Sequence, residues 1–119
     1  MPSLCKSILT FAAILLITSH AWAHARPKIM VPAAESTGPA PTKVVVTFSE
    51  PVEAKFSSLA LSDEKGITIG KEHSQGDPTD TKTLMLTVPK LGPGGYLVHW
   101  ISVAPDGHRM EGEYKFTVK

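Results

Sequence analysis

Residues 43–48 read KVVVTF, and this stretch decides the fold class of the chain. Successive side chains of a strand point to opposite faces, so Val44, Val46 and Phe48 form one apolar face. Three more stretches are rich in β-branched and apolar residues: 82–88, 96–101 and 113–118. Weaker strand signals lie at 28–31, 57–61 and 66–69.

Turn-forming residues separate these stretches, and no segment after residue 23 sustains the 3.6-residue periodicity of a helix. The polar residues 70–83 are expected to form a loop. Seven short strands separated by such turns predict an all-β fold, a seven-stranded Greek-key barrel or sandwich. Besides the stripe in 43–48, the predicted core contains Leu84, Leu86 and Val88, and Tyr114, Phe116 and Val118.

Residues 1–23 are predicted to be a Sec-type signal peptide. Lys6 precedes a continuous apolar run at 8–17, and Ala21-Trp22-Ala23 supplies an A-x-A cleavage pattern. The run of ten residues is too short for a membrane span, which takes about 20 residues. Cleavage after Ala23 predicts an exported, periplasmic domain of residues 24–119.

A second A-x-A match leaves the cleavage site open. Ala23-His24-Ala25 also fits the pattern, and cleavage after Ala25 would remove His24. The first site is preferred because it leaves the shorter polar stretch after the apolar run.

The predicted mature domain has balanced charge and no cysteine. The chain has 12 Lys and Arg against 11 Asp and Glu, and removal of Lys6 leaves 11 of each (12 − 1 = 11). This balance argues against nucleic acid as a partner and against electrostatic binding to membranes. The only cysteine, Cys5, lies in the predicted leader. Any metal would therefore be held by nitrogen, oxygen or thioether sulfur.

Cleavage before His24 would create a chelating residue. The new α-amino nitrogen and the imidazole Nδ1 belong to the same residue, so both can bind one metal ion. Two such nitrogens suit tetragonal Cu(II), the strongest binder among the divalent first-row metals. The alternative is that His24 only marks the end of the leader.

Asp106 and His108 form a second candidate group. Residues two apart in an extended chain project to the same side, and Gly107 between them adds no side chain. The carboxylate and the imidazole can then converge on one ion. A turn in which Asp106 bonds to its own backbone explains the same residues without a metal.

Five short motifs follow one another along the chain: HA at 24–25, TFSEPV at 47–52, GY at 95–96 followed by Trp100, APDGH at 104–108 and GEYKFTV at 112–118. In order and spacing they resemble the CopC family of periplasmic copper-binding proteins, and the resemblance covers essentially all of residues 24–119.

The resemblance implies a seven-stranded, cupredoxin-like or immunoglobulin-like β-barrel that binds one Cu(II) ion per chain in a histidine brace. Carried over residue by residue, His24 would provide its amino nitrogen and Nδ1. His108 would complete the nitrogen ligands, and Asp106 would be the weaker oxygen ligand. Glu50 matches the acid that lies beside the copper in the second shell.

The function implied is a monomeric periplasmic copper carrier. It would sequester Cu(II) in copper homeostasis or resistance, hand it to a CopD-type inner-membrane importer, and not act as an enzyme. Two alternatives are a histidine-brace copper monooxygenase and a metal-free immunoglobulin-like assembly domain. Against a monooxygenase, the sequence shows no exposed aromatic platform for a polysaccharide. A metal-free domain would not explain why His24, Asp106 and His108 occur together.

The chain departs from the family members that carry a methionine-rich Cu(I) loop. Residues 66–84 contain no methionine, and His73 is the only soft-metal candidate there. Met85 is expected in a core stripe, so the sequence predicts a member that binds Cu(II) only. His99 is expected on the surface, because its neighbour Trp100 takes the opposite, inward face.

Overall fold

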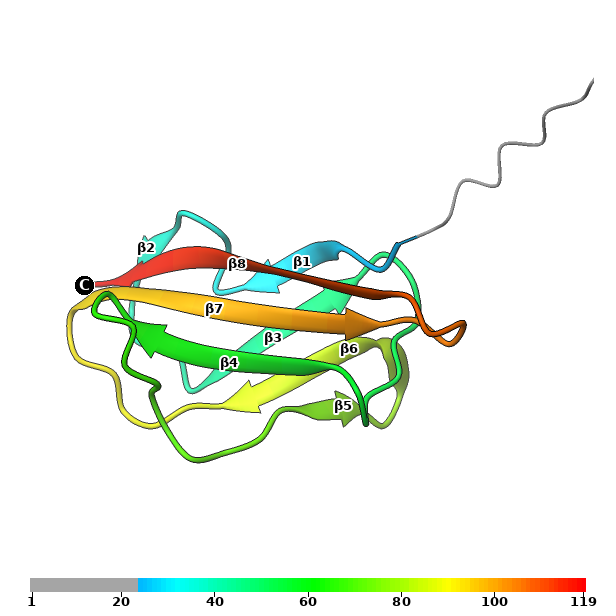
Figure 1. The fold of residues 1–119 in the computed structure, drawn as a ribbon. Helices are drawn as coiled ribbons and strands as arrows, with labels where there is room; N and C mark the ends of the chain where they lie inside the picture. Colours follow the sequence, from blue (N-terminus) through cyan, green and yellow to red (C-terminus); the bar gives the residue numbers. More distant parts are fainter. Residues whose placement is uncertain (1–23) are drawn as a thin grey trace, which may run out of the picture.

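The computed structural model describes residues 24–119, and the predicted leader lies outside the described residues. Within that range the chain forms eight strands and no helix, which confirms the all-β prediction (Figure 1). The strands are β1 (Pro27–Val31), β2 (Thr37–Gly38), β3 (Lys43–Phe48), β4 (Ser58–Asp63), β5 (Gln75–Asp77), β6 (Asp80–Thr87), β7 (Gly94–Val103) and β8 (Arg109–Val118). Across 24–119 there is accordingly no helix long and apolar enough to cross a membrane.

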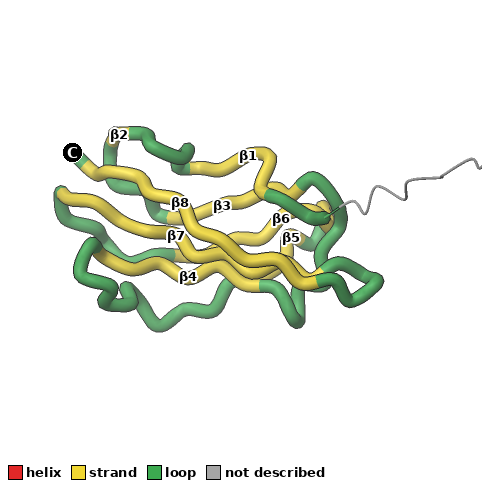
Figure 2. The backbone as a smooth tube through the Cα atoms, turned by 45° about the horizontal axis from the view of Figure 1, so that its top comes forward, coloured by secondary structure: helices red, strands yellow, loops and turns green. Residues whose placement is uncertain are grey.

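The strands form two four-stranded sheets that face each other (Figure 2). One sheet has the order β1-β3-β6-β5 and the other the order β2-β8-β7-β4. Neighbouring strands are antiparallel, except that β2 runs parallel to β8. This is the strand order of an immunoglobulin-like sandwich with one short strand, β2, added to the second sheet.

The predicted core stripes meet between the sheets. Val44, Val46 and Phe48 on β3 are 0% exposed. The other two stripes are buried as well. One lies on β6 and ends just beyond it, with Leu84, Leu86 and Val88, and the other lies on β8, with Tyr114, Phe116 and Val118. Each buried aliphatic side chain contributes about 1.5–3 kcal/mol of transfer free energy, so these stripes hold the sheets together.

Tyr96 ties the loop before β7 to this core. Its hydroxyl donates a 2.8 Å hydrogen bond to the carbonyl of Gly92, four residues earlier. Its ring stacks on Phe116, with 5.7 Å between the centroids. A tyrosine at this corner, bonded back to the preceding backbone, is a feature of immunoglobulin-like sandwiches.

One predicted strand does not form, and two observed strands were not predicted. Residues 66–69 form no strand and are linked to β4 only by an isolated bridge between Ser62 and Thr68. The reason is local: the Asp63 carboxylate accepts hydrogen bonds from the backbone N–H groups of Lys65 and Ile67, which favours a turn. The short strands β2 and β5 were not predicted, since neither carries an apolar alternation.

The predicted loop 70–83 ends earlier than expected, because it contains β5 and the start of β6. Asp80 organises this start by accepting hydrogen bonds from the Lys82 N–H (2.9 Å) and the Thr83 hydroxyl (2.8 Å). Met85 was predicted to lie in the core, and this prediction is wrong. It is half-buried and alternates with the buried Leu84 and Leu86, so it lies on the outer face of its sheet.

Candidate metal centre

Three segments meet at one end of the sandwich: the start of the domain, the loop between β3 and β4, and the loop between β7 and β8 (Figure 1). The first carries His24, the second begins with Ser49 and Glu50, and the third carries Asp106 and His108. Segments far apart in sequence therefore bring the predicted site residues to the same end of the fold.

The start of the domain is fixed to the sandwich. Ala25 is 2% exposed and belongs to the core cluster. Its carbonyl accepts a 2.7 Å hydrogen bond from the hydroxyl of Ser102 on β7. Ser49 donates to the carbonyl of His24 (3.2 Å) and accepts from the N–H of Arg26 (3.1 Å). The backbone is thus held at the carbonyl of His24 and at the two residues that follow it.

A tight turn presents Asp106 and His108. The Gly107 N–H donates to the Ala104 carbonyl (2.8 Å), and the Ala104 N–H donates to the His108 carbonyl (2.9 Å). Gly107 has φ = 91°, a left-handed conformation that residues with a Cβ rarely adopt. Glycine at this position is therefore needed for the turn itself, beyond leaving room between the two side chains.

Asp106 and His108 are in direct contact. The Nδ1 of His108 lies 2.9 Å from Oδ2 of Asp106, and the His108 N–H donates to Oδ1 at 3.1 Å. These two hydrogen bonds, the backbone one first, lower the pKa of the Asp106 carboxyl. The carboxylate is therefore ionised at neutral pH, as an oxygen ligand must be.

The rings of His24 and His108 face each other edge to face. Their centroids are 5.9 Å apart and their planes meet at 73°. A metal bound to a ring nitrogen at about 2 Å lies about 3 Å from that ring's centroid, so two rings on opposite sides of one ion are about 6 Å apart. The separation suits one ion between the two histidines.

The predicted ligand set is only partly brought together. Within residues 24–119 no three His, Cys, Asp or Glu side chains are grouped closely enough to hold a metal. Glu50 is half-buried and follows Ser49. No hydrogen bond or ion pair involves its carboxylate among the described residues, so its role beside the copper stays a prediction.

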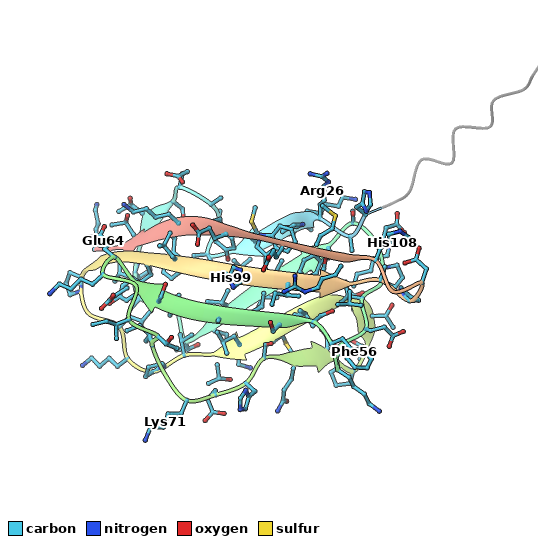
Figure 3. The ribbon with its side chains drawn as sticks, in the orientation of Figure 1. Arg26, Phe56, Glu64, Lys71, His99 and His108 are labelled. Atoms are coloured by element: carbon cyan, nitrogen blue, oxygen red, sulfur yellow. The ribbon has the colours of Figure 1, made fainter. Side chains whose placement is uncertain are left out.

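The other two histidines of residues 24–119 lie outside this group. His99 is exposed on β7, as predicted (Figure 3). Its Nε2 lies 3.3 Å from the Glu111 carboxylate. Arg109 reaches the same carboxylate at 3.4 Å. His73 is exposed and lines a small surface pocket with Met85, away from His108.

Sequence reasoning missed Ser49 and Ser102. The Ser49 hydroxyl lies within the TFSEPV motif, but its two backbone contacts appear only once the strands are folded. Ser102 had a signal: it continues the inward alternation of Val98 and Trp100, where an apolar residue is expected.

The fold and the site define a class: an immunoglobulin-like sandwich with a histidine pair at one end. Residues 28–119 match the family model described as "CopC domain". The chain therefore belongs to the CopC family.

Individual relatives agree. "Protein YobA" of Escherichia coli K12 is 36% identical, and "Copper resistance protein C" of Escherichia coli is 35% identical; each alignment covers 100% of both chains. Among solved structures, CopC from Methylosinus trichosporium OB3b has a TM-score of 0.75 at 31% identity, covering 81% of this chain and 94% of that one. PcoC, a methionine-rich copper resistance protein from Escherichia coli, has a TM-score of 0.70 at 33% identity, covering 82% and 100%.

Proposed function

We propose that the mature protein begins at His24 and binds one Cu(II) ion in the periplasm through His24, Asp106 and His108. The observation that carries the proposal is the 5.9 Å separation of the His24 and His108 rings at the end of a CopC-family fold. Several relatives are copper resistance proteins, which supports copper as the metal.

The burial of Ala25 supports cleavage before His24. Ala25 fills part of the core and its carbonyl is bonded to Ser102. Cleavage after Ala25 would remove this side chain and leave the buried Ser102 hydroxyl without its acceptor. A buried polar group without a partner costs about 1–3 kcal/mol, so the domain is more stable when it retains Ala25.

The contact between Asp106 and His108 supports both as ligands. Two donors bound at right angles to one ion, each at about 2 Å, are roughly 3 Å apart. The observed 2.9 Å between Oδ2 and Nδ1 fits that spacing. In the copper-free protein a proton joins the two atoms, and Cu(II) would replace it.

His24 would add its amino nitrogen and Nδ1, which completes three nitrogens and one oxygen. Such a donor set suits tetragonal Cu(II). The protein then acts as a carrier that sequesters Cu(II) and transfers it to a CopD-type inner-membrane protein. No catalytic step is assigned, and Glu50 is assigned a supporting place beside the ion.

Calorimetric titration tests this function. Protein that starts at His24 should bind one Cu(II) tightly per chain. A single glycine added before His24 converts the amine to an amide and should lower the affinity by about 100-fold or more, beyond the 10–100-fold typical for the loss of a residue that only supports a ligand. Equal affinity of the two proteins would refute the proposal.

A further inference from the structure

Ser49 contacts the backbone of both His24 and Arg26 at the start of the domain. Its hydroxyl donates to the His24 carbonyl and accepts from the Arg26 N–H, at 3.2 and 3.1 Å. Its own backbone N–H donates to the Arg26 carbonyl at 2.8 Å. One residue at the end of β3 thus binds three backbone groups of the segment that carries His24.

Ser102 makes the matching contact from the opposite sheet. It is 1% exposed, and its hydroxyl donates to the Ala25 carbonyl at 2.7 Å. Val98 and Trp100 precede it on the same inward face of β7, and both are apolar. A buried hydroxyl is stabilising only where it has a hydrogen-bond partner, and here that partner is the N-terminal segment.

We infer that Ser49 and Ser102 are positioning residues of the copper site, which fix the backbone of residues 24–26 so that His24 faces His108 before copper arrives. The inference rests on the proposed function. Neither serine is assigned as a ligand of the ion. Each acts through the backbone that carries the amine and the ring of His24.

The physical reason is conformational entropy. A chain terminus is ordinarily mobile, and a mobile His24 would have to be ordered when it binds the metal. Ordering one backbone residue shifts an equilibrium by about ten-fold or more. If the two serines already order the terminus in the folded protein, this entropy is lost on folding and not on metal binding. Copper then binds more tightly.

The test compares Ser49→Ala and Ser102→Ala in two backgrounds: protein that starts at His24, and the same protein with one glycine before His24. Cu(II) affinity is measured by competition with a chromophoric chelator. We expect about a ten-fold loss in the first background and a clearly smaller loss in the second, where the amine no longer binds and only the ring of His24 still has to be positioned. Ser49→Thr keeps the hydroxyl and should restore the affinity.

Ser74→Ala is the matched control, because Ser74 also accepts a backbone hydrogen bond, from Leu59, but away from the N-terminal segment. It should leave copper affinity unchanged. A second measurement needs no copper: amide hydrogen exchange at Arg26 should accelerate in Ser49→Ala. If Ser102→Ala does not fold, Ser49→Ala with its Thr rescue decides the question.

Two outcomes would overturn the inference. Equal losses in both backgrounds would show a general effect on the fold, and unchanged affinity in the first would show that the serines do not position His24. The proposed function fails separately, if the added glycine itself leaves the affinity of the unmutated protein unchanged.

Discussion

The imidazole of His24 lies edge-on to the imidazole of His108, with 5.9 Å between their centroids. The first residue of the described domain thus meets the turn between its last two strands. Neither segment places its histidine alone: the first needs Ser49 and Ser102, and the second needs the turn at Gly107. The pair therefore exists only in the folded sandwich.

Replacing His108 should remove most of the copper affinity. His108→Ala takes away one of three predicted nitrogens, so Cu(II) affinity should fall by more than about 100-fold. His99→Ala is the control, since His99 is an exposed histidine that contacts Glu111 and lies outside the pair. Titration of both variants with Cu(II) checks this. A comparable loss in His99→Ala would point to a different site.

Copper affinity should depend strongly on pH. Histidine side chains ordinarily take up a proton near pH 6.5, and metal binding requires the unprotonated form. Affinity should therefore fall as the pH is lowered from 8 to 5, because protons compete with the metal for the ring nitrogens. Competition titrations across this range measure the slope. A flat affinity would contradict a site built mainly from nitrogen.

Two buried tyrosines should respond oppositely to loss of the hydroxyl. Tyr114 is 8% exposed, its hydroxyl has no hydrogen-bond partner among residues 24–119, and burial raises its pKa. Tyr114→Phe should therefore raise the free energy of unfolding by up to about 1 kcal/mol. Tyr96→Phe removes the bond to Gly92 and should lower it by about 1 kcal/mol. Urea denaturation measures the free energy of unfolding of both variants. Equal losses in the two variants would contradict the claim that the Tyr96 hydroxyl stabilises the fold and the Tyr114 hydroxyl does not.

Asp80 should stabilise the fold at neutral pH but not in acid. Hydrogen bonds from the Lys82 N–H and the Thr83 hydroxyl lower the pKa of its carboxyl below the ordinary 3.8. A lowered pKa means that the contribution is present above 3.8 and is lost as the pH falls through the lowered value.

Asp80→Asn should consequently be less stable than the unmutated protein at pH 7, and the difference should shrink below pH 4. Urea denaturation at a series of pH values measures it. Glu53→Gln, at an exposed carboxylate on a loop, controls for the change of net charge. A difference that does not vary with pH would show that the ionised form of Asp80 has no special stability.

The sequence predicted the fold where side chains alternate strongly. β3, β7 and β8 bury the expected faces, because a strand between two apolar surfaces must alternate. The sequence did not predict β2 and β5. These strands pair with the edges of β8 and β6, and their own side chains carry no strand pattern. The prediction also failed at Met85, which was assigned to the core although it alternates with Leu84 and Leu86.

At the candidate metal centre, the proposed ligand residues could be predicted from the sequence, but the serines that hold the N-terminal segment could not. His24, Asp106 and His108 stand out because their chemistry suits copper. The hydroxyls of Ser49 and Ser102 matter through contacts with residues far away in the sequence, and serine is common in loops and strand ends. Only the register of the folded strands reveals such contacts.

The most direct test of the central claim is native mass spectrometry of the protein recovered from the periplasm of copper-supplied cells. The account predicts a polypeptide of residues 24–119 with one copper ion, which native conditions retain and acid removes. A polypeptide that begins at Arg26, keeps its leader, or carries no copper when it begins at His24 would contradict it.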